Sequence, residues 1–343
     1  MKPSDFSYNL PENLIAKHPP RTRGTSRLLV LDRRTGRVQD SHYANLAEFL
    51  DPGDLLIIND TKVMKSRLIA TKKNGAKREL VVLEKHLADT NWHQHQVLYR
   101  GRLQTGEELF IDQHKLEVVD ILGNGLAIIR SKSDLLELTN EYGTPPLPPY
   151  LKRDATPSDT ERYQTVFARN LGSAAAPTAS LNMTDSLLEK LRAKKIKITS
   201  LTLRVGLGTF LPIRVDDIRK HRMHAEYFVL PTQTLTAIRH AKQSGYRVIA
   251  LGTTVARTLE YCAKTINAQA TPSEVRGEAD IFIYPGYNFK IVDGLLTNFH
   301  APNSTVLMLA AAFAGWDNLS AAYEHAKSDS YKFLSYGDSM LIL

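Results

Sequence analysis

The chain has 343 residues, of which 43% are hydrophobic, so it is long enough for two domains and is not a disordered protein. Its formal charge of +8 favours a polyanionic partner such as nucleic acid without identifying one. The single cysteine, Cys262, excludes an intrachain disulfide and a cluster of thiolate ligands, as in a reducing cytoplasm. The first residues lack the apolar run of a signal peptide, and no apolar stretch reaches about 18 residues. We therefore expect a cytoplasmic protein with no membrane span.

The first portion has the pattern of an α/β domain. Residues 27–32 and 54–60 are apolar runs of strand length, and a helix is expected between them over residues 43–50.

The pattern changes from about residue 63 to residue 137. Short alternating or apolar runs recur there, separated by glycine-containing turns. The expected strands are 67–70, 79–84, 95–99, 108–111, 115–120 and 126–130. Regularly spaced short strands of this kind predict a small β-barrel.

A proline-rich segment at residues 145–149 forms a natural boundary, after which strands and helices alternate again. Expected strands are 196–205 and 247–251, and expected helices begin near 184, 232, 255 and 304. The prediction is an α/β fold whose large domain (residues 1–62 and 145–343) has a mostly parallel core sheet. Residues 63–144 would be an inserted β-barrel domain.

Residues 280–300 read as two short apolar strands, the second running into Thr297, Asn298 and His300. Polar side chains at the carboxyl end of a strand, just before a helix, are where α/β proteins place ligand sites. A capped turn with a core histidine would use the same residues.

Two glycine-containing strand ends are further candidates. Gly252, Thr253 and Thr254 follow an expected strand and precede a helix, where backbone N–H groups bind phosphate or carboxylate. Gly206 and Gly208 permit close approach of a ligand to the backbone. An ordinary helix cap and a tight turn, respectively, explain these segments as well.

His224 and Glu226 are two residues apart, which in a strand places both on one face. Such a pair can move a proton near neutral pH, or it can be a structural ion pair. The remaining histidines are scattered, so we expect no metal site. Residues 172–180, which include Thr178, are rich in small side chains and suit either a ligand or a plain loop.

Basic residues concentrate in 62–78, 152–153, 190–197 and 219–222. Side by side they would form a surface that follows a phosphate backbone, although solvated helix faces account for at least the group at 190–197.

Together and in this order, these segments resemble the S-adenosylmethionine:tRNA ribosyltransferase-isomerase family of queuosine biosynthesis. The resemblance covers nearly the whole chain. It is carried by Pro-Leu-Pro-Pro-Tyr at 146–150, Val-Gly-Leu-Gly-Thr-Phe at 205–210 and Met-His-Ala-Glu-Tyr at 223–227, and by residues 9–12, 26–32, 52–56, 59–61, 161–166, 175–179, 252–254, 280–300 and 335–338.

The resemblance implies an enzyme that uses S-adenosylmethionine as co-substrate and requires no metal. The amine of 7-aminomethyl-7-deazaguanine, at the wobble position of a tRNA, takes up the ribosyl part, and adenine and methionine leave. The product is epoxyqueuosine in tRNA. No membrane or protein partner is implied.

On this resemblance, His224 and Glu226 are expected to transfer protons, and His300 to lie near adenine. Gly252, Thr253, Thr254 and Arg257 would hold the methionine carboxylate. Other expected substrate contacts are Thr178, Gly206, Gly208, Asp280 and Asn298, and the expected tRNA contacts are Arg27, Lys62, Arg67, Lys152, Arg153 and Arg162.

Two positions depart from the family pattern, because Asn182 and Arg204 stand where histidines are usual. An asparagine cannot take up a proton, and an arginine stays charged at working pH. Two alternatives therefore stay open: a divergent paralogue that uses an adenosyl compound for small-molecule chemistry, and a non-catalytic tRNA-binding protein.

Overall fold

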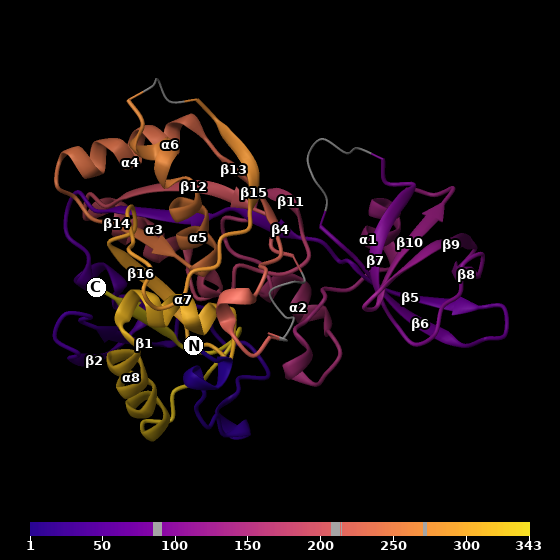
Figure 1. Ribbon diagram of the computed structural model, residues 1–343, viewed down its shortest axis with the longest axis horizontal. Helices are drawn as coiled ribbons and strands as arrows, with labels where there is room; N and C mark the ends of the chain where they lie inside the picture. Colours follow the sequence, from indigo (N-terminus) through magenta and orange to yellow (C-terminus); the bar gives the residue numbers. More distant parts are fainter. Residues whose placement is uncertain (85–90, 207–212, 214, 270–272) are drawn as a thin grey trace.

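The computed structural model describes residues 1–84, 91–206, 213, 215–269 and 273–343 (Figure 1). A large α/β body contains both chain termini, and a β-barrel projects from one side of it (Figure 1). This arrangement confirms the predicted fold class. Within the described ranges, no helix combines the length and apolar character needed to cross a bilayer.

The described part of the large body is built on one nine-stranded sheet. Its strands, in spatial order, are β15 (Val275–Ala279), β13 (Glu226–Leu230), β12 (Lys197–Leu203), β3 (Leu55–Asn59), β14 (Val248–Leu251), β16 (Gly294–Asn298), β17 (Ser339–Ile342), β1 (Arg27–Leu31) and β2 (Val38–His42). The four central strands, from β12 to β16, are parallel. The β12–β13, β13–β15, β16–β17 and β1–β2 pairs are antiparallel. The β1–β17 pair is parallel as well. The core of the sheet is therefore parallel as predicted, and antiparallel pairs lie toward both edges.

Helices cover both faces of this sheet. One layer contains α4 (Thr232–Gln243), α5 (Thr253–Tyr261), α6 (Ala263–Asn267), α7 (Thr305–Ala314) and α8 (Trp316–Ser328). The other contains α3 (Asp185–Ala193) and a 3-10 helix, Tyr43–Phe49, which occupies the place of the helix expected over 43–50. Successive residues of β3 alternate between the layers, as the period of a strand requires: Leu55 and Ile57 face the first and Leu56 and Ile58 the second.

The barrel confirms all six strands expected from the sequence. They are β5 (Arg67–Lys72), β6 (Lys77–Val82), β7 (Gln94–Arg100), β8 (Glu108–Ile111), β9 (His114–Gly123) and β10 (Leu126–Ser131), closed in the order β10-β7-β6-β5-β8-β9. Alternate side chains fill a separate core, against which α1 (Leu135–Tyr142) packs through Leu135 and Leu138. The domain limits 63–144 stay a prediction.

Short elements connect the two bodies. β4 (Thr61–Val63) leads into the barrel and pairs with β11 (Asn170–Ser173), after the return through α2 (Pro157–Arg162). Further 3-10 turns occupy Pro3–Phe6, Glu12–Leu14, Pro149–Leu151, Thr178–Ser180 and Ile218–Lys220.

One expected strand was wrong. Residues 280–283 are irregular, and the strand in this region, β15, ends at Ala279. Its neighbour β13 begins at Glu226, which pairs with Ala279, so the residues that follow have no strand beside them. The Glu260 carboxylate instead fixes the later backbone of this segment, because it accepts the N–H groups of Lys290, Ile291 and Val292 at 2.9 to 3.0 Å.

Candidate active site

A pocket lies where β13 begins and α5 and α7 start. Four residues expected at the site, Glu226, Thr253, Thr254 and Arg257, line it. The remaining lining residues are Met223, Ile281, Phe282, Ile283, Thr305, Val306 and Leu309. The pocket is therefore apolar on one wall and carries charged and hydroxyl groups on the other, which is the usual character of a small-molecule site.

The charged wall consists of a buried ion pair. The guanidinium of Arg257, from α5, contacts the carboxylate of Glu226, the first residue of β13. Glu226 also accepts the backbone N–H of Gly206 at 3.0 Å. Burial lowers the pKa of Arg257 to about 10, against the attraction of the exposed Asp280, so the guanidinium remains charged at neutral pH. The pocket thus holds a cation that can bind a ligand anion.

The start of α5 adds a hydroxyl group to this wall. Gly252 immediately precedes the helix with φ of +98°, a conformation that favours glycine, and its N–H is bonded to Leu296 O at 2.8 Å. The hydroxyl oxygen of Thr254 is buried and, within the described part of the chain, has no hydrogen-bond partner. A free hydroxyl at a helix N-terminus beside an arginine suits a carboxylate or phosphate.

His224 does not pair with Glu226. The prediction that the two share one strand face was wrong, because β13 begins at Glu226 and His224 lies before it. Nε2 of His224 instead lies 3.2 Å from Oε1 of Glu84, and this carboxylate raises the pKa of His224. Sequence reasoning missed Glu84, since it follows a barrel strand and nothing local marks it as functional.

His300 does not line the pocket. Its Nε2 is 3.0 Å from the hydroxyl of Thr297. Its backbone N–H donates to the Tyr323 hydroxyl at 2.9 Å, and its backbone carbonyl accepts the Tyr8 hydroxyl. Burial lowers the pKa of His300 to about 3. The imidazole is therefore neutral at physiological pH and can orient a group by hydrogen bonding without acting as a charged acid.

Thr178 and Asn298 form a second polar group at the end of β16. The Thr178 hydroxyl donates to Oδ1 of Asn298 at 2.9 Å, and Nδ2 of Asn298 donates to Asp338 O at 3.4 Å. Ala179 lies close to Gly252, which connects this group to the start of α5. Gly208 lies outside the described residues.

The two positions that depart from the family pattern do not line the pocket. Asn182 is buried and accepts the Ser26 hydroxyl at 2.9 Å, while its Nδ2 lies 3.1 Å from Gly337 O and 3.3 Å from Ser339 Oγ. Arg204 is also buried, with its guanidinium 5.8 Å from the centre of the Tyr227 ring. Asn182 is thus a cross-link between the segments that precede β1 and β17.

Most of the expected tRNA contacts already serve internal bonds. Arg153 pairs with the buried Asp159 at 2.7 Å, Arg67 with Glu79 at 2.9 Å, and Arg162 donates to Pro20 O at 2.8 Å. Lys152 pairs with Glu12 at 3.0 Å, and Arg27 lies 3.2 Å from Asp40 and over the Tyr331 ring. Lys62, on β4, is exposed.

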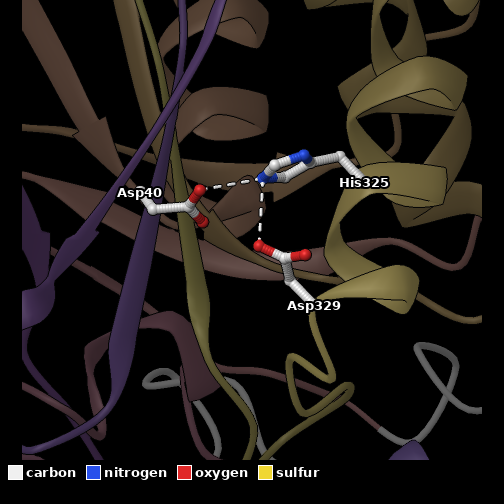
Figure 2. A group of neighbouring side chains, drawn as sticks. All are labelled: Asp40, His325 and Asp329. Carbon is white, nitrogen blue, oxygen red and sulfur yellow. Dashed lines mark hydrogen bonds and ion pairs between the residues drawn. The ribbon is translucent and has the colours of Figure 1, made fainter.

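Figure 2 shows a group of possible metal ligands away from the pocket, in which Nε2 of His325 lies 2.9 Å from Asp40 and 3.6 Å from Asp329. The guanidinium of Arg27 lies 3.2 and 3.9 Å from the same two carboxylates. This positive charge offsets one of the two carboxylates and His325 contacts both, so an ion-pair network between β2 and the end of α8 explains the group.

Replacing Asn182 with alanine tests its structural role. Asn182→Ala leaves several buried polar groups unpaired, so the free energy of unfolding should fall by about 2 to 4 kcal/mol, measured by chemical denaturation. Affinity for a carboxylate ligand of the pocket, at a temperature where the variant is folded, should stay within about twofold. A large loss of affinity with unchanged stability would place Asn182 in the site.

The depressed pKa of His300 predicts a pH-dependent stability. In the unfolded chain a histidine takes up a proton near pH 6.5, whereas the folded pKa is about 3. The stabilising contribution is therefore present above pH 6.5 and is lost as the pH falls below it. Between pH 7 and pH 5, His300→Gln should lose about 2 kcal/mol less unfolding free energy than the natural chain. Equal losses would mean that the imidazole is not buried neutral.

Comparison with known proteins identifies the family. The family model described as "Queuosine biosynthesis protein" matches residues 3–342. A curated relative from Pelodictyon phaeoclathratiforme is 54% identical over the full length of both chains, and one from Francisella tularensis subsp. mediasiatica is 43% identical over the full length of both; each is named S-adenosylmethionine:tRNA ribosyltransferase-isomerase. A crystal structure of S-adenosylmethionine tRNA ribosyltransferase from Thermotoga maritima matches 99% of this chain and 100% of its own, at 33% identity and a TM-score of 0.57. The chain belongs to the queuosine biosynthesis protein family.

Proposed function

We propose that this chain is an S-adenosylmethionine:tRNA ribosyltransferase-isomerase that works in the cytoplasm. Its substrates would be S-adenosylmethionine and a tRNA carrying 7-aminomethyl-7-deazaguanine at the wobble position. The observation that carries the proposal is the buried cation of Arg257 beside the start of α5, in a pocket that also has an apolar wall. Full-length relatives that carry this enzyme's name support it.

The pocket offers a matching group for each end of S-adenosylmethionine. The carboxylate of the methionine part would bind the Arg257 guanidinium and the hydroxyls of Thr253 and Thr254, with the α5 dipole adding to the attraction. The adenosyl part would lie against the apolar wall, which includes Phe282 and Leu309. Thr178, Asn298 and Asp280 are further candidates for contacts with the ribose and the base.

The reaction requires proton transfers that protein side chains can provide. The sulfonium acidifies the adjacent ribose carbon, so a base removes a proton there, and the departing adenine must gain a proton. His224 is the candidate for proton transfer, since it lies next to the pocket-lining Met223 and its ring is half exposed. Because the imidazole of His300 is neutral, we expect it to orient neighbouring groups by hydrogen bonding.

The divergent-paralogue hypothesis depended on the loss of two histidines. Asn182 and Arg204 do not line this pocket, so its lining gives that hypothesis no support. A non-catalytic tRNA-binding protein would not need a buried cation next to an unpartnered threonine hydroxyl.

Adenine release tests the function directly. With S-adenosylmethionine and tRNA carrying the 7-aminomethyl-7-deazaguanine base, we expect adenine to appear in proportion to modified tRNA, measured by liquid chromatography. The same tRNA with unmodified guanine is the matched control and should give none. Release without tRNA, or none with modified tRNA and folded protein, would contradict the proposal.

The buried ion pair provides a test of how S-adenosylmethionine binds. The double variant Glu226→Gln/Arg257→Gln removes both charges together, so no unpaired charge remains buried. Its dissociation constant for S-adenosylmethionine, measured by calorimetry, should rise at least about tenfold, which corresponds to about 1.4 kcal/mol. Glu226→Gln alone frees the guanidinium from its internal carboxylate, so it should bind at least as tightly as the natural chain. Tenfold weaker binding by Glu226→Gln with unchanged binding by the double variant would exclude Arg257 as the carboxylate ligand.

A further inference from the structure

The barrel contributes one carboxylate to the surroundings of the pocket. Glu84 follows the end of β6 by two residues, and its side chain is 12% exposed. The Glu84 carboxylate packs against Gly206, which follows β12 in the large body. A Cβ atom added to Gly206 would lie only 2.2 Å from Oε1 of Glu84. The absence of a side chain at Gly206 is therefore what lets Glu84 reach this position.

Glu84 holds a histidine at the edge of the pocket. Its Oε1 is 3.2 Å from Nε2 of His224, while Oε2 is buried and has no hydrogen-bond partner among the described residues. Because Glu84 occupies Nε2, the other ring nitrogen of His224 stays available for proton transfer. The charged groups that act on His224 are Glu84, Arg257 and Glu278.

We infer that Glu84, supplied by the barrel, is a positioning residue that orients His224 and keeps it protonated for the departure of adenine. This inference rests on the proposed function. As the bond between ribose and adenine breaks, its electron pair goes to the adenine ring. The imidazolium N–H gives its proton to an adenine nitrogen and becomes neutral imidazole.

The His224 pKa determines how the rate of adenine release depends on pH. Glu84 raises the pKa of His224, with Arg257 acting in the opposite direction. The protonated form, and the ion pair that it makes, are therefore fully present below about pH 6.5 and are lost as the pH rises through the raised pKa. Without the carboxylate, the alkaline decline in rate should begin at a lower pH.

The test combines a titration of His224 by NMR with the pH profile of adenine release. Glu84→Gln removes the charge but keeps the shape. Gly206→Ala displaces the Glu84 carboxylate by the added Cβ and gives a second variant if the first folds poorly. Glu117→Gln is the matched control, because Glu117 forms an exposed barrel pair with Arg130 at 2.9 Å. In both test variants we expect the His224 pKa and the alkaline limb of kcat to move down together by at least about 0.5 pH unit, with no movement in the control.

The outcomes separate the inference from the proposed function. An unchanged His224 pKa in Glu84→Gln would overturn the pairing, and a shifted pKa with an unmoved alkaline limb would overturn the role of His224 as proton donor. No adenine release by the natural chain would instead refute the proposed function, and the NMR titration would still decide whether the barrel holds His224.

Discussion

The buried ion pair between Glu226 and Arg257 is the interaction on which the site depends. It joins the first residue of β13 to α5, and through the Gly206 N–H it also fixes the end of β12. Removing one partner of a buried ion pair typically costs about 3 to 5 kcal/mol, a large share of a domain's free energy of unfolding, so a change of either residue alone should lower the stability of the fold. The Glu226 carboxylate therefore keeps the Arg257 guanidinium in place although it is buried away from water.

The same pair explains how the pocket can bind an anion and still remain folded when empty. Without ligand, Glu226 neutralises Arg257. A ligand carboxylate would have to share or replace that contact, with help from the backbone and hydroxyls at the start of α5. At the far end of the same helix, Glu260 is bonded to the backbone of residues 290–292, which lead into β16. One helix thus positions both the cation and the strand that ends at Asn298, whose side chain contacts Thr178.

Local patterns in the sequence predicted those helices and strands that form because of the residues within them. The six barrel strands, and α4 at residues 232–243, follow from alternation, periodicity and turn residues. The first of the two strands expected in residues 280–300 was wrong, because a strand there would need a partner and its neighbour β13 begins only opposite Ala279. Gly252, Thr253 and Thr254 do stand at the start of a helix, as expected, because a strand followed by glycine and a helix is a local pattern. Their role in binding stays a prediction.

Side-chain partners were not predictable in the same way. His224 and Glu226 are close in sequence, yet each pairs with a residue from another element, Glu84 and Arg257. Asn182 stands where a histidine is usual, and only its contacts with Ser26, Gly337 and Ser339 show that it is a structural cross-link. Such contacts depend on topology, which brings Glu84 to His224 and Asn182 to Ser26 and Gly337 although more than 100 residues separate each pair.

A crystal structure with S-adenosylmethionine, or its uncharged sulfur analogue S-adenosylhomocysteine, would test the central claim most directly. The account predicts the amino-acid carboxylate against the Arg257 guanidinium and the start of α5, with the adenosyl part along Phe282 and Leu309. A ligand bound elsewhere, with Arg257 still held only by Glu226, would contradict it.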